Sequence, residues 1–164
     1  MLKILYICTH NRCRSILSEA ITNEDSQHKI MAKSAGSDPA GVIHPLSLQY
    51  LVEAGYSTAD LKSQSWEEFK DFNPDFVITV CDSAAQQSCP LWFGRATQLY
   101  WELADPSILD GTEEQKRWAF NNTIDVIKKR VALLVEYADL SHAELTKKLL
   151  SVGAILTAKP SKIC

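Results

Sequence analysis

The residues best suited to chemistry stand together near the start of the chain, in the segment 8–15, which reads C-T-H-N-R-C-R-S. The thiol of Cys8 is followed six positions later by Arg14, and Ser15 comes next. A thiolate is a strong nucleophile, and a guanidinium group can bind two oxygens of one tetrahedral anion. This spacing arises by chance in about 15% of chains with such a composition, so its context has to carry the interpretation.

The elements on either side give this segment a second property. Residues 2–7 form a short apolar run typical of a buried strand, and a helical pattern begins at Cys13. A loop that leaves a strand and opens a helix can turn several backbone N–H groups toward one oxyanion. That positive field favours a thiolate, so we predict Cys8 as nucleophile, Arg14 as anion clamp and Ser15 as stabiliser of the thiolate. The predicted oxyanion-binding loop consists of Thr9, His10, Asn11, Arg12 and Cys13. The alternative is a buried strand-end cysteine beside a solvated arginine.

Apolar runs alternate with helix-length segments along the rest of the chain. Strands are predicted over 2–7, 30–34, 75–80 and 96–101, and helices over 13–23, over 45–55 and after capping boxes at Thr112 and Ser141. Strands separated by helices imply right-handed crossovers and a parallel sheet, hence an α/β fold. A length of 164 residues suits one domain.

The composition is that of an ordinary globular protein, with 46% hydrophobic and 23% charged residues and a net charge of -3. It excludes a largely disordered chain and argues against nucleic acid as a partner. No apolar run approaches the roughly 18 residues that span a bilayer, so no membrane contact is expected. The five cysteines are odd in number and follow no export signal, which predicts thiols in a reducing cytoplasm. Because no histidine and cysteine stand at zinc spacing, no zinc site is predicted.

These features together resemble the low-molecular-weight protein tyrosine phosphatases and the arsenate reductases that share their fold. Besides the C-x5-R-S segment, Asp105-Pro106 is similar to the D-P element that supplies the general acid in that superfamily. The segments 34–36 (S-A-G) and 44–45 (H-P) resemble further short elements. The resemblance covers residues 1–137 and implies a three-layer α/β sandwich with a four-stranded parallel sheet flanked by helices. Residues 138–164 are expected to form a helical extension of the same domain.

The two branches of this superfamily differ in the step after the attack by Cys8. A phosphatase forms a cysteinyl phosphate that water hydrolyses, and it needs no second thiol. An arsenate reductase needs a second thiolate to attack the sulfur of Cys8 and a third to pass on the disulfide. Cys81 comes directly after the predicted strand 75–80, so it shares the carboxyl edge of a parallel sheet with Cys8. The polar segment from Cys81 to Cys89 resembles the redox segment of thioredoxin-coupled arsenate reductases.

The sequence therefore predicts reduction of arsenate to arsenite, with thioredoxin or a similar dithiol as electron donor. Phosphate and sulfate are expected to mimic the substrate, and the chain is expected to be a monomer. The alternatives are a phosphatase acting on phosphotyrosine and a redox-sensing regulator without turnover. If these residues have no catalytic function, Cys81 is a packed core residue and Asp105-Pro106 is an ordinary turn. The residues assigned to the reaction are Cys8, Arg14, Ser15, Cys81, Cys89 and Asp105.

One interval and two positions depart from the pattern of the reductases. The interval between Cys81 and Cys89 is one residue longer, His10 stands where glycine is common, and Arg12 stands where a small polar residue is common. A histidine restricts the loop if that position needs a positive φ. Arg12 adds positive charge near the loop and favours an anionic substrate larger than arsenate.

The resemblance also implies a potassium ion near Asn11, Glu19 and Ser34. Gln64 stands near the place of a further acidic partner, and Glu19 has the alternative reading of a surface charge on the first helix. Two cysteines are expected to take no part in the chemistry. These are Cys13, packed at the start of the first helix, and Cys164, near the chain end.

Overall fold

The computed structural model describes residues 1–85 and 90–157, and within them four strands form one parallel sheet. All four residues of the third strand and five of the seven in the first are buried, which accounts for their continuous apolar runs. Every neighbouring pair is parallel. The strands are β1 (Leu2–Cys8), β2 (Ile30–Gly36), β3 (Phe76–Thr79) and β4 (Thr97–Tyr100), in the order β2-β1-β3-β4.

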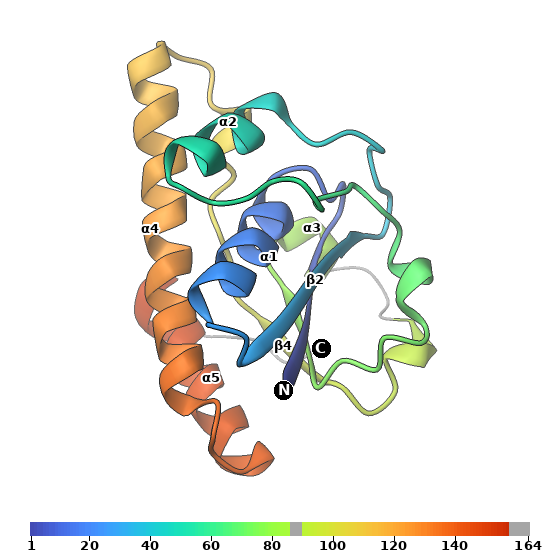
Figure 1. Cartoon of the computed structure of the whole chain (residues 1–164). Helices are drawn as coiled ribbons and strands as arrows, with labels where there is room; N and C mark the ends of the chain where they lie inside the picture. The colour runs from blue at the N-terminus through green and yellow to red at the C-terminus, as the bar shows by residue number, and fades with distance from the viewer. Residues whose placement is uncertain (86–89, 158–164) are drawn as a thin grey trace.

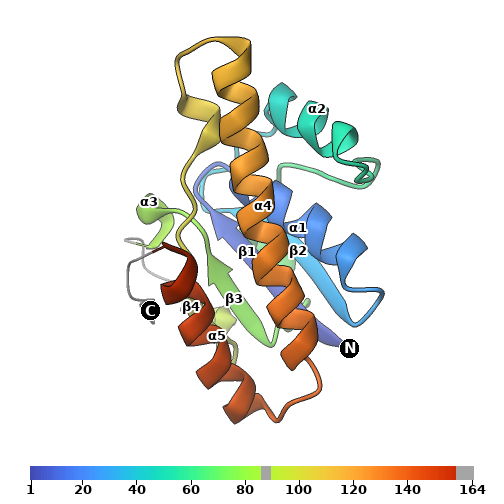
Figure 2. The same ribbon diagram turned by 90° about the vertical axis from the view of Figure 1, so that its left-hand side faces the viewer.

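Helical segments flank the sheet on both sides (Figure 1). On one side lie α1 (Arg14–Asp25), α4 (Glu113–Tyr137) and α5 (His142–Thr157), and on the other lie the short 3-10 helices η1 (Trp66–Phe69) and η2 (Leu91–Phe93). Figure 2 shows α4 crossing in front of the strands, with α5 beside β4. The connections carry α2 (Pro45–Glu53), α3 (Asp82–Ala85) and η3 (Pro106–Ile108). The predicted α/β class, with a four-stranded parallel sheet flanked by helices, is confirmed.

Local signals account for most element boundaries. Thr112 forms the predicted capping box with Gln115 at the start of α4, and Ser141 exchanges hydrogen bonds with Glu144 at the start of α5. One difference lies at the end of α5, which continues to Thr157 although the sequence shows no helical pattern after residue 153. No proline occurs between residue 142 and Pro160, so a helix anchored by the buried Leu145 and Leu149 can continue through Gly153.

The strand order creates a switch point between β1 and β3. From β1 the chain crosses to β2 on one side of it, and β3 then lies on the other side. Ligands of open α/β sheets bind beside such a point, at the carboxyl ends of the strands. Ile7 is paired with Thr79, so residues 8–9 and residues 80–81 leave the sheet side by side. The fold thus brings the segments of Cys8 and Cys81 together.

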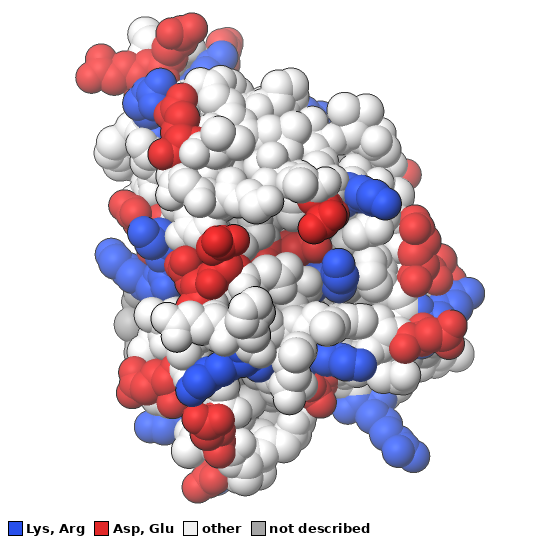
Figure 3. Space-filling view, viewed as in Figure 1, with Lys and Arg blue, Asp and Glu red and all other residues white. Residues whose placement is uncertain are grey.

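Charged side chains of both signs are mixed on the face shown in Figure 3. Both acidic and basic groups occur over α4 and η1 there, in keeping with the small net charge of -3. In the part of the chain that the structure describes, no helix is both long and apolar enough to cross a membrane.

Candidate active site

The loop between β1 and α1 is held in place from its outer side. The carbonyl oxygens of Thr9, His10 and Arg12 accept hydrogen bonds from backbone N–H groups in the segment 38–44, at 2.9, 3.0 and 3.0 Å. Because these carbonyls are turned outward, the loop keeps backbone N–H groups for its inner side, at the N-terminus of α1. This arrangement suits a small oxyanion.

Two positions allow the backbone to form this loop. Asn11 has a φ of 45°, a left-handed conformation that asparagine tolerates better than most residues. Gly36, the last residue of β2, lies against the loop, and a Cβ atom there would come within 2.5 Å of the carbonyl oxygen of Thr9. The positive φ falls on Asn11 and not on His10, so histidine in place of glycine does not strain the backbone.

The side chain of Asn11 orders the hydroxyl groups beneath the loop. Its Nδ2 donates to Ser15 Oγ and to Ser34 Oγ, both at 2.9 Å, and its Oδ1 accepts the backbone N–H of Gln64 at 2.8 Å. Since the oxygen of Ser15 accepts here, its own hydrogen is available to the sulfur of Cys8, whose pKa Ser15 lowers. The network therefore directs one hydroxyl donor at the predicted nucleophile.

Arg14 and Asp105 meet at the mouth of the loop. Nη1 of Arg14 donates to the carbonyl of Leu103 at 3.2 Å, and Nη2 donates to the carboxylate of Asp105 at 3.1 Å. Ser107 fixes the other oxygen of Asp105 through its N–H at 3.0 Å and its hydroxyl at 2.6 Å. Nε of Arg14 is buried, and no described group accepts its hydrogen. One edge of the guanidinium group is thus left for an anion.

The thiols of Cys8 and Cys81 contact each other at the carboxyl edge of the sheet. Their exposed fractions are 4% and 0%, and each thiol is the largest single influence on the pKa of the other. Thr9 donates its N–H to the sulfur of Cys81 at 3.3 Å, and its hydroxyl lies 3.6 Å from that sulfur. The hydrogen bonds from Cys8 and Thr9 outweigh burial and lower the pKa of Cys81 to about 5, whereas the contact with Cys81 and burial raise the pKa of Cys8. At neutral pH the pair therefore holds one proton and one negative charge.

We accordingly predict that the pair of Cys8 and Cys81 holds one thiolate at neutral pH. The ultraviolet absorbance of thiolates during a pH titration measures it. The midpoint should lie near pH 5, well below the ~8.5 of an ordinary cysteine. Cys13 should not contribute, because burial raises its pKa to about 12. In Cys8→Ala the midpoint should rise, since Cys81 loses its thiol donor. A midpoint near that of free cysteine in the unchanged chain would contradict a shared proton.

The structure brings most of the predicted site residues together. The loop, Ser15, Arg14 and Asp105 surround the end of β1, and Cys81 joins them from the end of β3. Cys13 is buried at the start of α1, near Ser47, whose hydroxyl donates to the carbonyl of Arg12 at 3.3 Å. The predictions for Cys89 and Cys164 lie outside the described residues.

Glu19 is buried, with 2% of its surface exposed, so its reading as a surface charge is wrong. Its carboxylate accepts the hydroxyl of Ser34 at 2.6 Å, and the ammonium group of Lys33 lies 3.9 Å away. The donor set does not fit a potassium ion, because Asn11 turns its amide nitrogen toward Ser34 and Lys33 already brings positive charge to Glu19. Within the ranges 1–85 and 90–157, no cluster of acidic, histidine or cysteine side chains could hold a metal ion.

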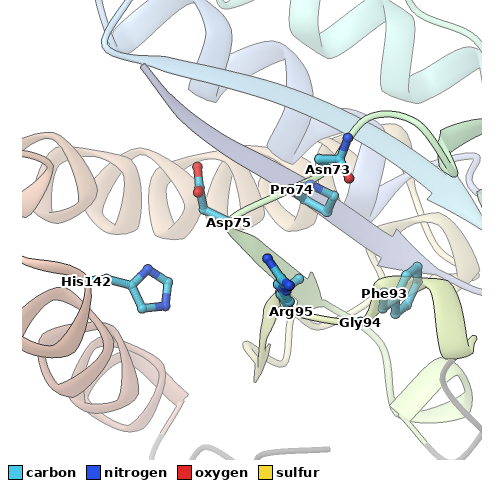
Figure 4. Close-up of a pocket in the computed structure, with 8 residues that line it drawn as sticks. Asn73, Pro74, Asp75, Phe93, Gly94, Arg95 and His142 are labelled. Atoms are coloured by element: carbon cyan, nitrogen blue, oxygen red, sulfur yellow. The ribbon is translucent and has the colours of Figure 1, made fainter.

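A pocket of about 520 Å³ lies at the opposite edge of the sheet, where β3 and β4 begin. Figure 4 shows Arg95 between Asp75 on one side and Phe93 on the other, with His142 facing them from α5. The ring of His142 stacks on Phe76 with 4.9 Å between centroids. This pocket contains no thiol and is separated from Cys8 by the length of β1, so it is not part of the candidate active site.

Comparisons with known proteins agree with this geometry. A family model described as low molecular weight phosphotyrosine protein phosphatase matches residues 3–149. An arsenate reductase from Bacillus licheniformis is 31% identical over 134 residues, which are 81% of this chain and 94% of the relative. A glutaredoxin arsenate reductase from Synechocystis sp. is 28% identical over 135 residues, which are 82% of this chain and 97% of the relative.

Among solved structures, a thioredoxin-dependent arsenate reductase from Corynebacterium glutamicum superimposes with a TM-score of 0.65 at 28% identity. The match covers 85% of this chain and 63% of that chain. The likeness thus extends over most of the sheet and helices described here.

Proposed function

We propose that this chain, which belongs to the low molecular weight phosphotyrosine protein phosphatase family, reduces arsenate to arsenite through exchange between thiols and disulfides. Relatives named arsenate reductases support this assignment within the family. The observation that carries it is that the buried thiols of Cys8 and Cys81 lie together at the ends of β1 and β3, where each shifts the pKa of the other. A phosphatase uses only one of these sulfurs, whereas a reductase needs the second within bonding reach.

In the first proposed step, the sulfur of Cys8 attacks the arsenic atom of an arsenate held in the loop. Arg14 binds two oxygens of the anion once it gives up its contact with Asp105, and the N–H groups of the loop bind the others. A sulfur–arsenic bond forms, and one arsenic–oxygen bond breaks. The oxygen leaves as water after it receives a proton from Asp105, which takes that proton up from solvent once Arg14 has released its carboxylate. The proton of Cys8 passes to the neighbouring thiolate of Cys81, whose pKa is the lower of the two.

In the second step, Cys81 gives its proton to an oxygen of the adduct and attacks the sulfur of Cys8. The sulfur–sulfur bond forms as the sulfur–arsenic bond breaks, and the electron pair of that bond stays on arsenic. Arsenic is thereby reduced from the pentavalent to the trivalent state and leaves as arsenite. Cys8 and Cys81 are oxidised to one disulfide.

The cycle closes when an external dithiol protein of the thioredoxin or glutaredoxin type reduces the disulfide, after exchange has released Cys8 from it. Cys89 is proposed to take the disulfide over from Cys8, so that the bond reduced by the partner joins Cys81 and Cys89. Such a cycle requires a compartment that keeps thiols reduced, and the cytoplasm meets this requirement.

A single-turnover experiment tests the proposal. The fully reduced chain is incubated with arsenate without an electron donor, arsenite is quantified, and disulfides are mapped by mass spectrometry. We expect one arsenite per chain together with a disulfide that contains Cys81. Thioredoxin, thioredoxin reductase and NADPH should then support repeated turnover. Arsenate incubation that yields neither arsenite nor a disulfide would refute the assignment.

The family also favours a second candidate, the hydrolysis of phosphotyrosine through a cysteinyl phosphate. Cys8, Arg14 and Asp105 would serve that reaction as nucleophile, clamp and acid. Hydrolysis of an aryl phosphate by the same preparation measures it directly. Rapid hydrolysis without arsenite formation would decide for the phosphatase.

A further inference from the structure

Arg130 is a buried cation on α4, with 2% of its surface exposed. No described carboxylate forms an ion pair with it, and although burial lowers the pKa of its guanidinium to about 10, it stays charged at neutral pH. Its Nη1 donates to the carbonyl of Trp101 at 3.0 Å, and its Nη2 donates to the carbonyl of Glu102 at 2.9 Å. Burying a cation without an anionic partner costs free energy, and these two hydrogen bonds offset part of that cost.

The backbone that Arg130 holds continues directly into the candidate active site. The next carbonyl, that of Leu103, accepts the hydrogen bond from Nη1 of Arg14 at 3.2 Å. Three successive carbonyls at 101–103 are thus bound by two guanidinium groups that come from different helices, α4 and α1. On its other side this segment is paired with the end of β3, through the N–H groups of Trp101 and Leu103. Asp105, the second partner of Arg14, comes two residues later.

We propose that Arg130 is a positioning residue for oxyanion binding, which fixes the segment 101–103 so that the carbonyl of Leu103 aims the guanidinium of Arg14 into the loop. Without Arg130 the carbonyls of residues 101 and 102 lose their donors, and the segment can turn. Arg14 then loses the acceptor that fixes one of its nitrogens. The inference rests on the proposed role of Arg14 as anion clamp, and it adds a residue that acts from α4 through the backbone of another segment.

Binding of inorganic phosphate to the reduced chain, measured by calorimetry without any turnover, tests this inference separately from the proposed reaction. Arg130→Met should weaken phosphate binding about tenfold, and Arg14→Lys about a hundredfold. If Arg130 acts through Arg14, the double variant should bind phosphate no more weakly than Arg14→Lys alone, because the guanidinium group that Arg130 positions is already absent. Leu134→Ala, at a buried position one turn further along α4, serves as a matched destabilised control that should keep the affinity of the unchanged chain.

Arg130→Lys keeps the charge but not the bidentate geometry, so it should weaken phosphate binding by an intermediate factor of about threefold. If Arg130→Met does not fold, Arg130→Lys replaces it in the double-mutant cycle with Arg14→Lys. Unchanged phosphate affinity in the Arg130 variants would overturn the inference. So would a loss that adds in full to that of Arg14→Lys, or an equal loss in Leu134→Ala, since general destabilisation produces both. If the Arg130 and Arg14 variants show the expected coupling in phosphate affinity but the unchanged chain never forms arsenite, the role of Arg130 stands and only the proposed reaction is rejected.

Discussion

Replacing Cys8 by serine is expected to abolish arsenate reduction and any hydrolysis of aryl phosphates, each by at least about a thousandfold. Both reactions begin with a bond from the sulfur of Cys8 to the central atom of the anion, and a hydroxyl group at this place is a far weaker nucleophile. Serine differs from cysteine by one atom, so the loop that Asn11 and Gly36 support should keep its shape. Phosphate affinity measured beside both rates should therefore stay within about threefold of its normal value.

Cys164→Ser is the matched control for this experiment, because it makes the same chemical change at a cysteine for which we predict no role. It should leave both rates unchanged. Arsenite formation at an appreciable rate in Cys8→Ser would place the nucleophile elsewhere. A loss of phosphate binding along with turnover would show that the thiol also shapes the loop.

The order of elements could be read from the sequence because each element carries its own local signal. Apolar runs mark the buried strands, and Thr112 and Ser141 mark helix starts through hydrogen bonds within a few residues. The end of α5 could not be read in the same way, because the helix continues past Gly153 and depends on anchoring by distant side chains. Trp101, whose indole N–H donates to the carbonyl of Leu149 at 3.0 Å, is one of these anchors.

The candidate site was predictable to the extent that sheet topology alone places its residues. Cys8 and Cys81 stand at the ends of strands whose carboxyl ends share one edge, so their proximity results from the strand order. The hydrogen bonds from Arg14 to Leu103 and from Arg130 to residues 101–102 join residues far apart in the sequence, and no local pattern specifies them. Arg130 nevertheless left a signal, because it stands within the apolar stripe of α4, next to Val131, where an exposed arginine is not expected.

Replacing Cys81 by serine is expected to stop arsenite formation, again by at least about a thousandfold, while changing aryl phosphate hydrolysis by less than about tenfold. A serine hydroxyl can still accept hydrogen bonds from Thr9, but it cannot form a disulfide with Cys8. Arsenate should therefore be held as an adduct or released unreduced. Hydrolysis needs only Cys8, Arg14 and Asp105, all of which remain. Single-turnover arsenite yield and aryl phosphate hydrolysis, measured on one preparation, check both expectations.

The same variant should also change the acidity of Cys8, which gives a readout that does not depend on turnover. The contact with Cys81 is the largest cause that raises the pKa of Cys8, so its removal should lower that pKa and speed alkylation of Cys8 at neutral pH. A structural role of Cys81 as a packed core residue predicts no such acceleration. Unchanged arsenite formation in Cys81→Ser would reject the exchange between these two thiols. If the unchanged chain turns over neither substrate and yet forms a disulfide at Cys81 on oxidation, it is instead a redox-sensing regulator, because the paired thiols would then respond to oxidants without a catalytic cycle.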